Sequence, residues 1–113
     1  GAVLGEISAL ISGNRDYFVS LLALNPELFS GGRVKAMLRR AIEIALRDIG
    51  AIQDERTLHM LSEYTVSGVL SLYSAWFDEG CAGSLDDVTE TARRLATNGL
   101  NGFVPGERLK EIL

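Results

Sequence analysis

Residues that crosslink or interrupt a chain are scarce in this sequence. Among its 113 residues there are one cysteine and two prolines. The single thiol, Cys81, excludes an intramolecular disulfide framework. The longest run without a charged residue, 64–77, is too short to span a bilayer. Since a signal-peptide pattern is also lacking, we expect a cytoplasmic protein that does not contact a membrane.

Catalytic and metal-binding motifs are also lacking. The sequence contains no G-x-x-x-x-G-K, G-x-S-x-G, C-x-x-C or H-E-x-x-H pattern. Its one histidine, His59, has neither a cysteine nor paired carboxylates at ligand spacing. We therefore expect no enzyme activity, no catalytic residue, no metal site and no cofactor. A small cofactor-independent enzyme would need a buried carboxylate with a strongly raised pKa.

Positive charge is not concentrated on any segment. The formal net charge is −4 because acidic residues outnumber and intermix with basic ones. Arg33, Arg40 and Arg47 recur at seven-residue spacing, which is compatible with a phosphate-binding stripe. Glu43 and Asp48 lie close by, so a solvated helix face is the favoured interpretation. This chain is not expected to bind DNA by itself.

What the sequence does contain is a series of segments with helical spacing. Leu, Ala, Ile and Arg recur at intervals of three and four residues in place of β-branched alternation. Start and stop residues divide the chain into predicted helices at 2–12, 17–24, 33–49, 55–79 and 85–100, with a last short helix after Pro105. The pattern predicts a single all-α domain, 1–113, folded as an antiparallel bundle of about five to six helices.

Particular residues set the predicted ends of these helices. Asn14 and Ser84 are expected to cap helix starts with their side chains. Gly50 and Gly80 are expected to end helices, because glycine adopts the left-handed conformation found there. Pro105 suits the first position of the last helix.

The segment 55–79 carries two apolar stripes. Projected at 100° per residue, the first contains Leu58, Leu61, Thr65, Val69, Leu72 and Trp76, and the second contains Val66, Leu70, Tyr73 and Phe77. One core is not expected to use both stripes, so one should face a second copy of the chain. The remaining face carries Ser67, Ser71 and Ser74, which are small enough for another backbone to approach.

Aromatic and thioether side chains give the candidate ligand site. These residues lie on helices whose apolar faces exceed the needs of one small core: Tyr17, Phe18, Met37, Met60 and Tyr64. Plain core packing is one interpretation. The other is an apolar cavity with a few phenolic hydroxyls, which suits a small hydrophobic effector that is neutral or weakly anionic.

Three segments together resemble a known family. They are ISGNRDYFVSLLAL near the start, SGVLSLYSAWFDEG in the middle and SLDDVTETARRLATNGL near the end. Their order and character are similar to those of the C-terminal regulatory domain of TetR-family transcriptional regulators. The resemblance covers nearly the whole chain.

The resemblance implies a homodimer and an effector pocket. In that family the last two long helices pair with their copies in a four-helix interface, and the earlier helices enclose the pocket. On this chain the expected interface residues are Val69, Tyr73, Phe77, Val88, Ala92, Leu95, Ala96 and Gly99. Among these, Ala92, Ala96 and Gly99 are small enough to let a partner helix come close.

DNA would be contacted only through an N-terminal helix-turn-helix domain, which this sequence does not include. The chain begins GAVLGEI with apolar residues already at helical spacing, as though cut from something longer. It therefore resembles either an excised regulatory domain or a family member without that part. The alternative function is a stand-alone helical dimer that acts as an interaction scaffold.

Overall fold

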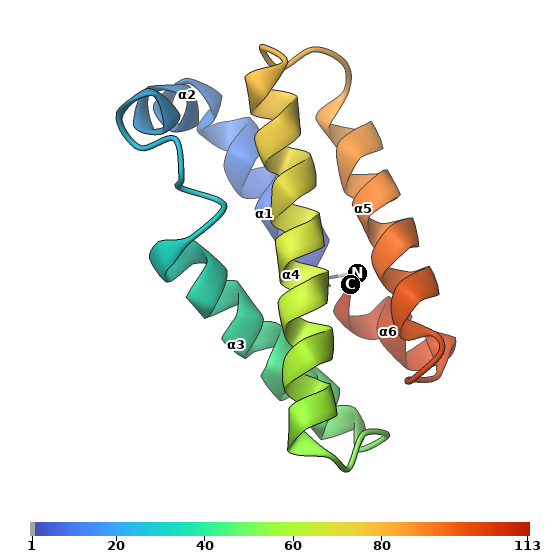
Figure 1. Ribbon diagram of the computed structural model, residues 1–113. Coiled ribbons are helices and arrows are strands. Elements are labelled where there is room, and N and C mark those ends of the chain that lie inside the picture. The colour runs from blue at the N-terminus through green and yellow to red at the C-terminus, as the bar shows by residue number, and fades with distance from the viewer. Residues whose placement is uncertain (1) are drawn as a thin grey trace.

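The computed structural model describes residues 2–113, and within that range it contains six α-helices and no strand. The helices are α1 (Ala2–Gly13), α2 (Arg15–Leu24), α3 (Gly32–Ile49), α4 (Glu55–Asp78), α5 (Leu85–Leu100) and α6 (Gly106–Ile112). All six pack into one helical bundle (Figure 1). The predicted all-α class is confirmed, and most helix boundaries fall within two residues of those expected.

Several helix ends form as the local sequence predicts. The side chain of Ser84 accepts a hydrogen bond from the backbone N–H of Asp87 at 3.4 Å and so caps α5. Asp54 caps α4 by accepting from the backbone N–H of Arg56 at 3.2 Å. Gly50 and Gly80 have φ values of 76° and 73°, as expected for glycines that end helices.

Two predicted caps differ in the structure. The side chain of Asn14 makes no capping hydrogen bond to α2, and instead donates to the Leu10 carbonyl at 2.9 Å. Helices α1 and α2 follow one another with only Asn14 between them, so this side chain completes the end of α1. Pro105 is the residue before α6 and not its first residue.

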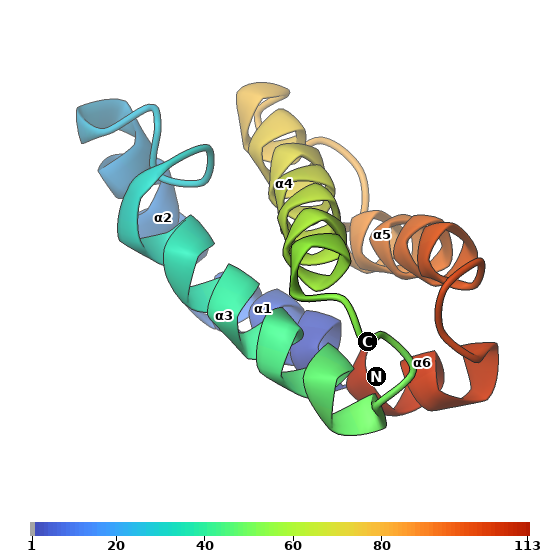
Figure 2. The same ribbon diagram turned by 60° about the horizontal axis from the view of Figure 1, so that its bottom comes forward.

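Helix α4 is the centre of the bundle. It makes its most extensive contacts with α3 on one side and α5 on the other. In Figure 1, α4 runs in front of α1, and in Figure 2 the bundle seen from its lower end shows α3 and α5 flanking α4. Helix α6 closes the base of the bundle by contacting α5, α1 and α3.

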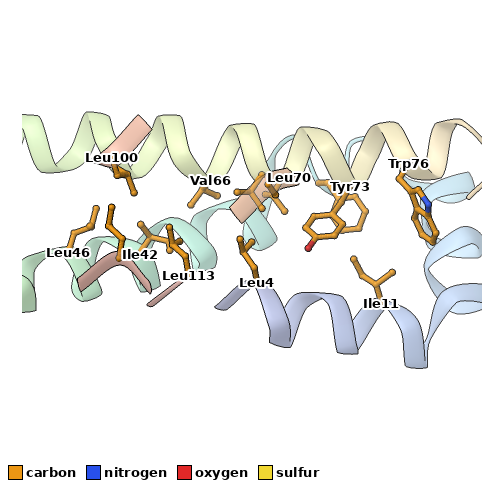
Figure 3. Packing of buried hydrophobic residues seen from close by; sticks show 14 of the residues in the cluster. Leu4, Ile11, Ile42, Leu46, Val66, Leu70, Tyr73, Trp76, Leu100 and Leu113 are labelled. Atoms are coloured by element: carbon orange, nitrogen blue, oxygen red, sulfur yellow. The ribbon is translucent and has the colours of Figure 1, made fainter. Parts of the chain in front are cut away.

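The core lies beneath α4. Leu4 and Ile11 of α1 point toward Leu70 and Tyr73 of α4 (Figure 3). Two core side chains are fully buried, Tyr73 of α4 and Leu46 of α3. The hydroxyls of Tyr73 and Thr89 lie 2.8 Å apart, so this buried pair joins α4 to α5 by a hydrogen bond.

The expectation that one core cannot use both stripes of α4 is wrong. Thr65, Val69 and Trp76 of the first stripe are buried, and so are Val66, Leu70 and Tyr73 of the second. A single neighbouring helix could not cover so wide an apolar arc. Helices α3 and α5 flank α4, and side chains of α1 pack beneath it, so that together they bury both stripes within one copy (Figure 3).

The buried hydroxyl pair gives the first testable prediction. Tyr73→Phe leaves the Thr89 hydroxyl buried without its partner, so it should lower the free energy of unfolding by about 1–3 kcal/mol. Thr89→Val should destabilise the protein in the same way. The double variant should lose less than the sum of the two losses, because the second change removes the group that the first left unpaired. Urea unfolding of the four proteins measures this, and strictly additive losses would contradict it.

Alkaline pH gives the second prediction. Burial raises the pKa of the Tyr73 hydroxyl above its ordinary value. The folded state therefore holds this proton more tightly than the unfolded state does. The contribution of the neutral hydroxyl to the free energy of unfolding is complete below the unfolded pKa of about 10, and it is lost as the pH rises from there through the folded pKa. The free energy of unfolding should fall more steeply above about pH 10 in the wild type than in Tyr73→Phe. Equal slopes for the two proteins would show that Tyr73 ionises freely in the fold.

Candidate functional site

An extended concave surface lies between α4 and α5. We call it the α4/α5 groove, and its volume is about 760 Å³. Its lining comes from three segments: Leu61, Tyr64, Thr65, Gly68, Val69, Ser71 and Leu72 of α4, then Ala92, Leu95, Ala96, Asn98, Gly99 and Leu100 of α5, and Phe103 after α5. None of these described residues is charged. The groove is therefore an uncharged, mainly apolar hollow in the surface of one copy.

Large side chains of the groove are open to water. Tyr64 is 80% exposed, Leu95 61% and Phe103 53%. The small residues Gly68 and Gly99 lie between them and are also exposed. These side chains give the groove a contiguous apolar surface, which is a candidate contact site for another molecule.

Three of the predicted interface residues line this surface in accessible positions, and two more lie at its floor. Leu95, Ala96 and Gly99 line the groove with at least partial exposure. Val69 and Ala92 also line it, but only 8% and 1% of their surfaces are exposed, because α4 and α5 pack against each other there. These two residues support the groove from within.

The other three predicted interface residues lie elsewhere. Val88 is half-buried in a neighbouring hollow between α4 and α5. Tyr73 is fully buried in the core, so its assignment to a surface interface is wrong. Phe77 faces the opposite side of the bundle, where its ring centroid lies 6.2 Å from that of Phe18 and 5.7 Å from that of Phe29. The Tyr73 assignment failed because helical spacing gives a direction around α4 without saying which neighbour fills it, whereas the interface roles of Val88 and Phe77 stay predictions.

The predicted ligand residues do not enclose one cavity within a single copy. Tyr17, Met37, Met60 and Tyr64 are 55–80% exposed. Phe18 is half-buried among the aromatic rings at the end of α4. Most of the aromatic and thioether side chains that the sequence assigned to a ligand site therefore lie on outer faces of the bundle. Ligand binding by these five residues stays a prediction.

A second concave surface lies on the other side of α4. We call it the serine cleft, and its volume is about 270 Å³. Ser67, Ser71 and Ser74 of α4 form one wall, and Phe29 and Ser30 of the loop before α3 form the other. Lys35, Leu70, Ala75 and Asp78 complete its lining. The sequence signal for this cleft was the serine face, which was expected to admit another backbone, and the loop at Phe29 and Ser30 is the segment that approaches it.

A row of charged side chains joins α3 to α4. Lys35 lies 2.6 Å from Glu63, and this contact lowers the pKa of the Glu63 carboxyl. Arg47 lies 2.8 Å from Glu55, which raises the pKa of the Arg47 guanidinium. Each of these solvent-accessible pairs contributes little stability, and together they link the polar edges of α3 and α4. Arg47 therefore belongs to a contact between helices and is not simply part of a solvated stripe.

His59 lies in the middle of this row. Its Nε2 is 2.7 Å from Nη1 of Arg39, and its Nδ1 is 3.3 Å from Oε1 of Glu43. A guanidinium can only donate hydrogen bonds, so Nε2 must accept and Nδ1 must carry the proton of the neutral ring. His59 thus acts as a polar link between α3 and α4.

Two classes of site find no support in the described part of the chain. Residues 2–113 contain no group of three or more His, Cys, Asp or Glu side chains placed to hold a metal ion. No helix within that range is long and apolar enough to cross a membrane.

Comparisons with known proteins add no identification. No family model matches the chain, and no match is found among curated proteins or solved structures. The similarity to TetR-family regulatory domains therefore depends on the three sequence segments alone, and the groove and the cleft must be interpreted from their own chemistry.

The His59 geometry gives the third prediction. At a pH where the ring is neutral, nitrogen-15 NMR should show the proton on Nδ1, because Arg39 occupies Nε2. Arg39→Ala should remove this restriction and raise the population of the other tautomer. Arg40→Ala is the matched control, since Arg40 is exposed and makes no ion pair within residues 2–113. A wild-type ring protonated on Nε2 would contradict the assigned contact.

Proposed function

We propose that this chain is a homodimerising, effector-sensing regulatory domain of the TetR-like type. In this proposal, effector binding shifts helices that position a helix-turn-helix domain, which these 113 residues do not include. The observation that carries the proposal is the α4/α5 groove, with its exposed Tyr64, Leu95 and Phe103. The resemblance of the three sequence segments independently implies an interface at the same two helices.

Apolar burial would drive the pairing. Fully burying a large apolar side chain stabilises a complex by about 1.5–3 kcal/mol relative to exposure. Tyr64, Leu95 and Phe103 together present more apolar surface than scattered exposed residues usually do. Gly68 and Gly99 carry no side chain, so a helix of the second copy can approach α4 and α5 closely.

The shape of the groove favours a second copy as its occupant. A twofold interface uses the same patch on both subunits, so the patch must contain both protrusions and hollows. The α4/α5 groove has both, since Leu95 and Phe103 border a hollow of about 760 Å³. Each copy carries a net charge of −4, yet the described lining has no charged residue. Two copies can therefore meet there without burying like charges.

Effector sensing is supported by the position of α4 between two concave surfaces. Ser71 lines both the serine cleft and the α4/α5 groove. A ligand that shifts or rigidifies α4 from the cleft side would alter the pairing surface on the groove side. By thermodynamic linkage, dimerisation would change the affinity for that ligand by the same factor.

A scaffold function is the second candidate. Four of the five predicted ligand residues are exposed and do not enclose a cavity, so the groove alone would suffice for a stand-alone dimer. A change in dimer affinity on ligand binding would favour the regulatory domain. A dimer whose stability no ligand alters would favour the scaffold.

Leu95 provides the fourth prediction. Leu95→Arg places an unpaired charge at the centre of the proposed interface and should convert a dimer to a monomer, raising the dissociation constant by about 100-fold or more. Sedimentation velocity across micromolar concentrations measures this. Leu95 is exposed in one copy, so the variant should keep the helical content of the wild type.

Leu24→Arg is the matched control for this experiment. Leu24 is 87% exposed at the end of α2 and lies outside the groove, so this variant should dimerise like the wild type. A wild-type protein that remains monomeric at micromolar concentration would overturn the proposed interface.

A further inference from the structure

We infer that the serine cleft binds a small organic cation that carries several N–H or O–H donors. The binding chemistry follows from the cleft itself, whereas the role of this ligand as the effector rests on the proposed function. This inference differs from the sequence-based expectation of a hydrophobic, neutral or weakly anionic ligand held by Tyr17, Phe18, Met37, Met60 and Tyr64.

The cleft has a buried apolar floor. Phe29 and Leu70 line it, and only 5% and 2% of their surfaces are exposed. Phe29 is held in place by Phe77 of α4 and Phe18 of α2, whose ring centroids lie 5.7 Å and 6.0 Å from its own. The volume of about 270 Å³ corresponds to roughly nine molecules of liquid water. The site therefore suits a compact ligand.

Three of the four serines that line the cleft, Ser30, Ser67 and Ser71, donate their hydroxyl protons to acceptors within the protein. Ser71 donates its proton to the Gly68 carbonyl at 2.8 Å, and Ser30 donates to the Glu27 carbonyl at 3.4 Å. Ser67 donates to the Glu63 carboxylate at 3.4 Å. Each hydroxyl has one proton and two lone pairs, so these three serines can accept from a ligand but have already used their protons.

The charge of the cleft points in the same direction. Lys35 is the one basic residue in the described lining, and it lies 2.6 Å from the Glu63 carboxylate, which also lies 3.9 Å from Arg39. Asp78 at the other end forms no ion pair within residues 2–113. The last turn of α4, to which Asp78 belongs, contains no basic residue. The negative end of the helix dipole and the Asp78 carboxylate therefore both favour a cation.

These features together define the ligand. An ammonium group would lie at Asp78, and hydroxyl or further N–H donors would reach the serine oxygens. The apolar floor would contact the carbon skeleton. An anionic ligand would be repelled by the Asp78 carboxylate, and a ligand that only accepts hydrogen bonds would find few free donors among the described lining residues.

The test uses three compact probes of matched shape in phosphate buffer. The protonated amine tris(hydroxymethyl)aminomethane is the cation, pentaerythritol is the neutral analogue, and 2,2-bis(hydroxymethyl)propionate is the anion. Amide resonances are followed by nitrogen-15 NMR during titration. We expect the cation to shift Ser30, Ser74 and Asp78 saturably, about fivefold more tightly than the neutral analogue. The anion should cause no saturable shift.

Two variants test the location of the site. Asp78→Asn should weaken binding of the cation about fivefold. Asp48→Asn is the matched control, because it removes one exposed acidic charge from α3 outside the cleft. It should leave the affinity unchanged. Equal weakening by both variants would overturn the inference, because it would reflect a general attraction to negative charge. Equal binding of all three probes would also overturn it, because it would reflect non-selective contact.

The same titration on Leu95→Arg separates this inference from the proposed function. If the wild type is monomeric and the cation still binds in an Asp78-dependent way, the cleft is confirmed and the dimeric regulatory domain is not. If the wild type dimerises but no cation binds, the cleft inference fails and the interface stands. If the cation binds and also changes the dimer dissociation constant, the cleft is the effector site of the proposed domain.

Discussion

The need to cover α4 on several sides determines how the rest of this protein is arranged. Its apolar side chains occupy too wide an arc for one neighbouring helix, so α3 and α5 flank it and side chains of α1 pack beneath it. The buried Tyr73 hydroxyl adds a directional requirement, because it must find a polar partner in the core. Thr89 supplies that partner at 2.8 Å and thereby fixes how α5 lies along α4. Hydrophobic burial sets which helices gather around α4, and this hydrogen bond helps set their alignment.

What the neighbours leave uncovered gives the molecule its two candidate surfaces. On one edge of α4, α5 packs closely at Ala92 but diverges toward Leu95 and Phe103, which leaves the apolar α4/α5 groove. On another edge, the loop carrying Phe29 and Ser30 covers the serine face only in part, which leaves the serine cleft. Both surfaces remain because the neighbouring segments do not cover the whole circumference of α4.

The sequence predicts local features of this fold, such as helix ends, better than it predicts which residues contact one another. Ser84 and Gly80 were predicted correctly, because capping depends on a few adjacent residues. Tyr73 and Phe77 were assigned to a dimer interface because their spacing places them on a stripe, and the stripe alone does not reveal that α5 and the Phe29 loop cover it. Exposed Tyr17 was equally hard to place, since an apolar residue on a small domain can lie inside or outside the core. The serine face was visible in the sequence, but the side chains opposite it come from a distant loop.

The two surfaces differ in the force that would fill them, and this difference separates their roles. The described lining of the groove is uncharged, so pairing there would depend on apolar burial and respond weakly to simple salt. The cleft ends at the exposed Asp78, which forms no ion pair within residues 2–113, so binding there would weaken as salt screens the attraction for a cation. Because Ser71 lines both surfaces on one rigid helix, a polar ligand on one side can influence an apolar contact on the other. In the proposed function, α4 would thus couple cation binding in the cleft to apolar pairing in the groove, with Ser71 at the boundary between the two surfaces.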